Sequence, residues 1–183
     1  MDLPEWQTET KKYDYQVREA DVPDGYTESV SRSGDTYTVT NTLKKYDLTI
    51  RKEIAKEDFY AAHGDATFLY QITSKQNPAQ KWYREISFTA EDAKNSGGAL
   101  TGETTLNLPV GAYEVEEMDA LRYEGKIIEI SGNVKKIGAL QVEATLGSDD
   151  TPETVTYTNQ KSWWDRFSHN DLVINQLKES ERR

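Results

Sequence analysis

The chain has 183 residues, a formal net charge of −10, no cysteine and a hydrophobic fraction of 36%. The lack of cysteine excludes disulfides and thiolate zinc sites. The acidic balance argues against binding to nucleic acid, which needs Lys and Arg to displace counterions. No apolar run approaches the ~18 residues of a membrane span, and we recognise no signal peptide or LPxTG-type sorting motif.

The first segment, residues 1–43, has the pattern of a short β-ribbon. A Y-x-V-x-E pattern ends at Glu19 and a Y-x-V-x-N pattern ends at Asn41, each typical of a strand with alternating faces. The Pro–Asp–Gly turn within 22–26 and a second turn at 33–35 separate the expected strands. We therefore expect a small β unit at the N-terminus.

Residues 44–161 carry strand patterns at regular spacing. Thr, Val, Tyr and Ile alternate with polar residues, without a long helical period, in segments that include 47–54, 66–74, 81–90, 111–117 and 154–160. This pattern predicts an all-β fold, an antiparallel Ig-like (prealbumin-like) β-sandwich. A hairpin over Gly132–Asn133 is expected to join 122–132 to 134–147.

Three of these strands each place one polar residue at an inward-facing position. The motifs are L-x-I-x-K at 48–52, G-x-Y-x-V-x-E at 111–117 and V-x-Y-x-N at 155–159. In each motif the last residue shares a face with aliphatic and aromatic side chains. An edge strand whose last residue reaches water would explain one such case. Buried lysine and glutamate are rare unless they are paired. We therefore expect the three inward polar side chains of this domain, Lys52, Glu117 and Asn159, to meet.

If these side chains meet, a covalent reaction is available to them. Burial disfavours a charged lysine, and a neutral Lys52 amine is a nucleophile. A protonated Glu117 could polarise the side-chain carbonyl of Asn159 and shuttle protons. Attack of Lys52 on that carbonyl would release ammonia and leave an amide between the two side chains. The alternative is an unreacted, buried Lys52–Glu117 ion pair.

The three motifs, in this order, resemble those of the B-type repeat domains of the collagen adhesin (Cna-B-type) and related isopeptide-forming pilin domains of Gram-positive surface proteins. The resemblance implies a β-sandwich with an intramolecular isopeptide bond between Lys52 and Asn159, promoted by Glu117 as its catalyst. It also implies a structural role without cofactor, and no enzymatic turnover beyond a single self-crosslinking step.

The same resemblance implies a biological setting. The chain would be a stalk segment of a secreted adhesin or pilin at the cell surface or in the cell wall. Its partners would be the neighbouring domains of the same surface protein, and a host matrix protein or glycan is a further candidate partner. No nucleic acid and no membrane span in this chain are expected.

The family pattern divides the chain into three parts. Residues 1–43 resemble the C-terminal part of a preceding domain, with Glu19 and Asn41 as a remnant motif and without the lysine strand, so we expect no bond at Asn41. A self-sufficient ribbon packed on the next domain is the alternative, although a short ribbon alone is marginally stable. Residues 44–161 would be the complete domain, and 162–183 a short tail with helix-forming residues that folds back on it.

Other polar and aromatic residues suggest weaker sites. His63 and His169 are far apart in the sequence and lack further ligands nearby, so no metal site is expected. Trp82 and Tyr83, together with Tyr60, could form an aromatic platform. The alternative function is therefore a β-sandwich module that binds a glycan or a host matrix protein and keeps an unreacted buried Lys–Glu–Asn network.

Overall fold

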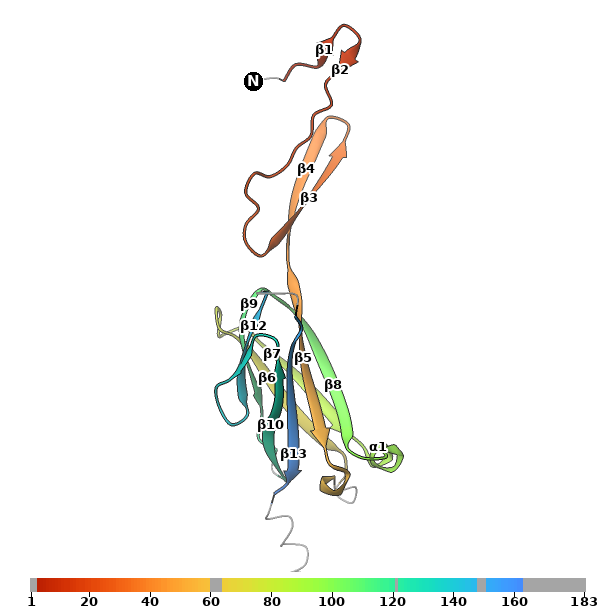
Figure 1. Ribbon diagram of the computed structural model, residues 1–183, viewed down its shortest axis with the longest axis vertical. Coiled ribbons are helices and arrows are strands. Elements are labelled where there is room, and N and C mark those ends of the chain that lie inside the picture. The colour runs from red at the N-terminus through yellow and green to blue at the C-terminus, as the bar shows by residue number, and fades with distance from the viewer. Residues whose placement is uncertain (1–2, 60–63, 121, 148–150, 163–183) are drawn as a thin grey trace, which may run out of the picture. The chain divides into compact units, whose positions relative to one another are not determined.

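The computed structural model describes residues 3–59, 64–120, 122–147 and 151–162 (Figure 1). Backbone proximity divides the chain into a first unit, Met1–Lys44, and a second unit, Lys45–Arg183. The predicted fold class is confirmed, because the chain is mostly β and forms several antiparallel sheets.

The described residues of the first unit form two hairpins. Its strands are β1 (Trp6–Thr8), β2 (Lys11–Lys12), β3 (Tyr26–Ser33) and β4 (Thr36–Leu43). β1 pairs with β2, and β3 pairs with β4 along its full length. The turn predicted at 33–35 is confirmed as the connection between β3 and β4.

The strand expected to end at Glu19 is absent: residues 13–19 belong to no strand. β4 is paired with β3 by every one of its residues, and the backbone N–H of Glu19 donates to the side chain of Glu28 on β3 at 2.6 Å instead of to the backbone of a neighbouring strand. Alternation alone therefore does not form a strand here, because a strand also needs backbone partners along its length.

The second unit is a sandwich of two sheets (Figure 1). One sheet has the strand order β10-β13-β5-β8 and the other has the order β11-β12-β9-β6-β7. The strands are β5 (Lys45–Ile54), β6 (Ala66–Ser74), β7 (Lys81–Phe88), β8 (Leu100–Pro109), β9 (Gly111–Glu117), β10 (Tyr123–Ser131), β11 (Val134–Lys136), β12 (Gln141–Leu146) and β13 (Glu153–Lys161). A 3-10 helix, η1 (Lys56–Asp58), and an α-helix, α1 (Ala90–Asn95), lie in the connections.

The core lies between these two sheets. Alternate residues of the central strands point inward, as in β6, where buried and more exposed residues alternate from Ala66 to Ser74. The buried apolar side chains of the described residues all belong to the second unit and include Leu48, Phe68, Val115 and Tyr157. In a two-layer sandwich, the residues at alternate, inward-facing positions are buried, and here these are branched and aromatic side chains.

One strand pair departs from the expected antiparallel arrangement. β5 and β13, the first and last strands of the second unit, pair in parallel, with Lys52 opposite Tyr157 and Ile54 opposite Asn159. A parallel pair needs a long connection, and every other strand described in the unit lies in the chain between these two. Lys52 and Asn159 thus come from neighbouring strands of one sheet.

The hairpin predicted over Gly132–Asn133 is also wrong. β10 pairs with β13 in one sheet, and β11 pairs with β12 in the other, so this turn carries the chain from one sheet to the other. Gly-Asn is a turn signal in either case, because it specifies a reversal of the chain but not which strands pair.

Candidate functional site: a buried lysine, glutamate and asparagine

Lys52 lies inside the sandwich. It occupies an inward position of β5 between Ile50 and Ile54, and like them it is 0% exposed. Its side chain is therefore held among aliphatic groups by the same alternation that buries its neighbours. A lysine at such a position needs a partner, since a buried ammonium without one is costly.

Glu117 supplies that partner from the opposite sheet. It is the last residue of β9, and its side chain is fully buried. The Lys52 Nζ lies 2.8 Å from Glu117 Oε1 and 2.7 Å from Glu117 Oε2. The ammonium thus donates to both carboxylate oxygens, and the ion pair bridges the two layers of the sandwich.

Asn159 completes the group. It occupies an inward position of β13 and is 2% exposed, and its Oδ1 accepts a hydrogen bond from Lys52 Nζ. Its Cα partner on β10 is Gly125, where a Cβ atom would come within 2.8 Å of Leu140 Cδ2 and 3.2 Å of Asn159 Oδ1. Glycine at this position therefore lets Leu140 pack close to the Asn159 side chain.

Aromatic rings surround the amine. Lys52 Nζ lies 4.1 Å from the ring centroid of Phe68 and 6.0 Å from that of Tyr157. Tyr157 in turn packs against Tyr70 with ring centroids 5.3 Å apart. Such an apolar cage excludes water, which strengthens the electrostatic interactions inside it and disfavours charge that has no partner.

The electrostatics of the site bring the amine close to neutrality. Burial lowers the pKa of Lys52 from 10.5 to about 8, although the Glu117 carboxylate opposes this shift by stabilising the ammonium. A buried ion pair is weak evidence for stability by itself, because desolvation offsets the attraction between its charges. Transfer of one proton from Nζ to Glu117 would remove both charges and leave a nucleophilic amine next to an amide carbonyl.

The three residues whose roles the sequence resemblance implied are therefore neighbours. Lys52, Glu117 and Asn159 come from three strands in two sheets, and each is buried. The arrangement provides a nucleophile, a carboxyl group that can carry a proton, and a carbonyl group with a nitrogen leaving group. These are the parts that an acyl transfer between side chains requires.

The remnant motif of the first unit has a different environment. Asn41 is exposed on β4, and its Cα partner is Glu28 rather than a lysine. Glu19 is half-buried and makes its backbone hydrogen bond to the same Glu28. The described structure thus brings a second carboxylate, and no lysine, into register with Asn41.

The candidate aromatic platform is divided between two faces of β7. Trp82 packs against the core and contacts Tyr113 edge-on at 5.8 Å between ring centroids. Tyr83 is 52% exposed, and its hydroxyl donates to Gln71 Oε1 at 3.1 Å. Tyr60 lies outside the described residues. The two described rings therefore do not form one surface.

Several other expectations concern residues outside the described part of the chain, namely His63, His169 and the aromatic residues of the tail 162–183. Among the residues that the structure does describe, no group of three or more His, Cys, Asp or Glu side chains is placed to hold a metal ion. Within the same described ranges, no helix has the length and apolarity needed to cross a membrane.

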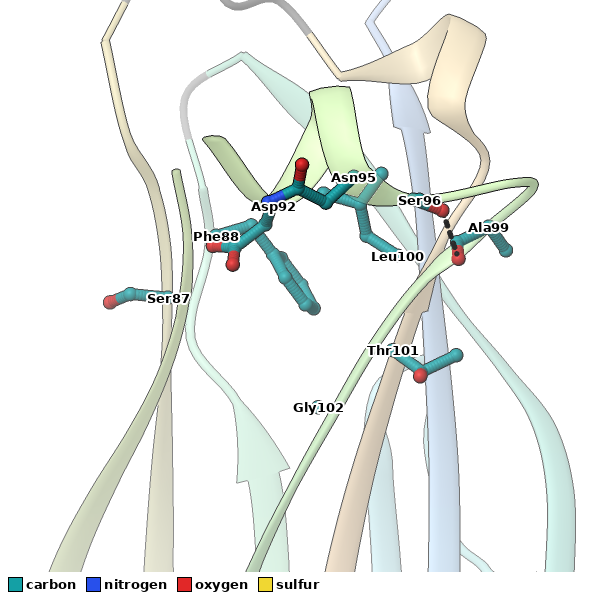
Figure 2. Close-up of a pocket in the computed structure, with 9 residues that line it drawn as sticks. All are labelled: Ser87, Phe88, Asp92, Asn95, Ser96, Ala99, Leu100, Thr101 and Gly102. Carbon is teal, nitrogen blue, oxygen red and sulfur yellow. Dashed lines mark hydrogen bonds between the residues drawn. The ribbon is translucent and has the colours of Figure 1, made fainter. Parts of the chain in front are cut away.

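A cavity of about 390 Å³ lies beside α1 and the ends of β7 and β8 (Figure 2). Two of its polar lining residues take part in local hydrogen bonds: Asp92 caps the helix reciprocally with Thr89, and the Ser96 hydroxyl donates to the backbone oxygen of Ala99 at 3.0 Å. The cavity lies where the short helix connects to β8, and its lining does not include Glu117 or Asn159.

Sequence reasoning missed the aromatic side chains of the site. Phe68 and Tyr70 lie on β6 at inward positions, and alternation identifies them as core residues. The pattern does not show which polar group each ring contacts, because that depends on the pairing of β6 with β9 and on the packing of the two sheets.

The fold and site define an all-β sandwich with a buried Lys–Glu–Asn group. Residues 1–42 match the model of the Cna protein B-type domain, which confirms the family resemblance for that part of the chain. Cna-B-type domains are structural rather than catalytic. Comparison with curated proteins gives no match.

Two solved structures are similar to parts of the chain. One is a bacterial adhesin from Mobiluncus mulieris that contains intramolecular disulfide, isopeptide and ester bond cross-links, with 14% identity and a TM-score of 0.41 over 72% of this chain and 45% of that one. The other is a mutant of the pilus-presented adhesin Cpa, with 20% identity and a TM-score of 0.34 over 64% of this chain and 28% of that one. The chain spans less than half the length of either structure.

Proposed function

We propose that the chain is a structural stalk segment of a Gram-positive cell-surface adhesin or pilin, in which Lys52 and Asn159 join through an autocatalytic isopeptide bond. The observation that carries the proposal is the contact of one buried amine with both Glu117 and Asn159. The family match at residues 1–42 supports the stalk role, and a stalk role implies a location at the cell surface and neighbouring domains of the same protein as partners.

The proposed reaction balances without a co-reactant. One proton of the Lys52 ammonium passes to Glu117, and the neutral Nζ attacks Cγ of Asn159. A second proton of the amine goes to the departing side-chain nitrogen, which leaves as ammonia when the carbon–nitrogen bond breaks. The new amide keeps one N–H, and Glu117 ends the reaction protonated.

The bond would offset two costs of this fold. Only 36% of the residues are hydrophobic, so the core is thin, and the site itself buries a charged pair. Joining residues that are 107 positions apart in the sequence would restrict the unfolded chain, with an effect of about 4.7 kcal/mol in the chain-entropy model. Loss of the ammonium would also remove the buried ion pair.

The experiment is an intact-mass measurement of the purified chain beside its Glu117→Ala variant. We expect the wild type to be lighter than its calculated mass by one ammonia and the variant to have its full mass. Asn41→Ala is the matched control, because it removes an exposed asparagine from a strand and should leave the mass deficit unchanged. If the wild type has its full calculated mass, no bond has formed and the site is only a buried ion pair. That result would overturn the proposal.

A further inference from the structure

Tyr70 lies next to Glu117 but has no role in the reaction steps proposed above. It lies on β6 as the direct Cα partner of Glu117 on β9, and directly opposite residues of an antiparallel pair have neighbouring side chains. The residue is 0% exposed. Its hydroxyl makes no hydrogen bond of ordinary geometry with any of the described residues. A buried hydroxyl without a partner costs free energy.

The hydroxyl is nevertheless within electrostatic reach of the carboxylate. Burial raises the pKa of Tyr70, and the negative charge of Glu117, the neighbouring Tyr157 and a weak side-chain hydrogen-bonding interaction with Glu117 raise it further. The phenol therefore keeps its proton and remains a hydrogen-bond donor. The neighbouring Tyr157 differs, because its hydroxyl already donates to the backbone oxygen of Val115 at 3.4 Å.

The number of N–H donors on Lys52 falls during the proposed reaction, and this change would give Tyr70 an acceptor. Before the reaction, the three N–H groups of Lys52 are directed to Oε1 and Oε2 of Glu117 and to Oδ1 of Asn159. After the proposed reaction the same nitrogen carries one N–H. At least one oxygen of Glu117 therefore loses its donor inside a dry cavity, where an unpaired polar atom is costly.

We propose that Tyr70 is a positioning residue for Glu117, donating to the carboxyl oxygen that Lys52 vacates. This inference rests on the proposed function. As the amine gives up its protons, the tyrosine hydroxyl takes over one of its hydrogen bonds and holds the carboxyl group facing the reacting amide. No covalent bond changes at Tyr70, and its proton stays on the phenol oxygen.

The test is the rate of bond formation in the full chain. Wild type, Tyr70→Phe and Tyr157→Phe are made by cell-free synthesis, quenched with acid at successive times, and analysed by intact mass. Loss of one hydrogen bond in the transition state predicts about a tenfold slower loss of ammonia for Tyr70→Phe. Tyr157→Phe is the matched control, with an expected change of less than about twofold, since its hydroxyl already donates to the backbone oxygen of Val115.

Two further readouts separate positioning from a packing effect. In an Asn159→Ala background, which cannot react, Tyr70→Phe should leave the melting temperature unchanged or raise it, because the hydroxyl makes no hydrogen bond of ordinary geometry before the reaction. In the cross-linked product, the infrared carbonyl stretch of protonated Glu117 should move to higher frequency in Tyr70→Phe, because a hydrogen bond to that oxygen is lost.

The outcomes distinguish this inference from the proposed function. Equal rates for wild type and Tyr70→Phe, or an unshifted carbonyl band, would overturn the role of Tyr70 while the bond itself stands. A melting temperature that falls in the unreactive background would assign the rate change to packing and would also overturn it. A wild type that never loses ammonia would refute the proposed function first.

Discussion

Asn159 lies two residues beyond Tyr157, the residue that pairs with Lys52 across the parallel β5–β13 ladder. Residues two apart on a strand share a face, so the asparagine side chain is inward like that of Lys52. The lysine side chain is long enough to contact it and still contact Glu117 on the opposite sheet. The alternation of inward-facing residues that buries the Lys52 amine therefore also places it beside the Asn159 amide.

Removal of the amide should show what the bond contributes to stability. Asn159→Ala prevents cross-linking, and the chain-entropy model predicts a loss of about 4.7 kcal/mol in the free energy of unfolding for a loop of this length. The measurement is chemical denaturation of the wild type and the variant. Asn41→Ala, in the first unit, should leave the unfolding of the second unit unchanged; equal midpoints for wild type and Asn159→Ala would contradict this prediction.

Removal of the carboxylate should leave a buried cation without a partner. In the unreactive Asn159→Ala background, a further Glu117→Ala change is expected to cost about 3–5 kcal/mol, the range found when one member of a buried ion pair is deleted. The comparison is the denaturation midpoint of the double variant against that of Asn159→Ala alone. A difference below about 1 kcal/mol would show that Lys52 finds another partner or reaches solvent.

The unreacted site should also make stability depend on pH. The pKa of Lys52 is lowered from 10.5 to about 8 on folding, so between these values the unfolded chain binds more protons than the folded chain. The free energy of unfolding of Asn159→Ala should therefore rise with pH across that window. Without Glu117, which holds the pKa up, the rise should begin at lower pH. Lys52→Met in the same background should abolish the slope.

The rate of bond formation should have a different pH dependence. The reactive state has a neutral amine and a protonated Glu117, which together carry the same number of protons as the ion pair. Tyr70 and Tyr157, which face the pair from β6 and β13, stay neutral because burial raises their pKa values. The rate should be level through neutral pH and fall above about 8, where the pair loses its transferable proton. A rate that keeps rising with pH would instead indicate that the free amine alone limits the reaction.

A glycine beside the site gives a packing test. Gly102 is the Cα partner of Lys52 on β8, and a Cβ atom there would lie 2.6 Å from Ile86 Cγ2 and 3.4 Å from the Phe88 ring. Gly102→Ala should therefore destabilise the unit by about 1–3 kcal/mol through overpacking. Gly97→Ala is the matched control, since a Cβ atom there meets nothing within 4 Å. The measurement is thermal unfolding of both variants.

The sequence predicted the site better than it predicted the connections. Lys52, Glu117 and Asn159 were identified by face parity, and parity holds wherever a strand forms, because it depends only on the local backbone. Pairing depends on distant segments. The parallel β5–β13 ladder and the separation of β10 from β11 into different sheets were accordingly not foreseen.

The Y-x-V-x-E pattern shows the same limit within one chain. At 113–117 the pattern lies on β9, with partners on both sides from β6 and β12. At 15–19 the same spacing forms no strand. The alternating sequence pattern is the same in the two segments. Only the segment that has neighbouring strands to pair with forms a strand. Tyr70 was missed for a related reason, because its register with Glu117 is a property of the β6–β9 pair.

The parallel pairing of β5 and β13 determines how the second unit would respond to tension. In a parallel pair, the start of the first strand and the end of the last strand point to opposite ends of the ladder. Pulling at these two ends would slide the strands lengthwise past each other and load their hydrogen bonds together rather than one after another. A Lys52–Asn159 bond would cross that sliding plane and stop the displacement at its first step, so that extension would be limited by a covalent bond instead of by the rate of forced unfolding.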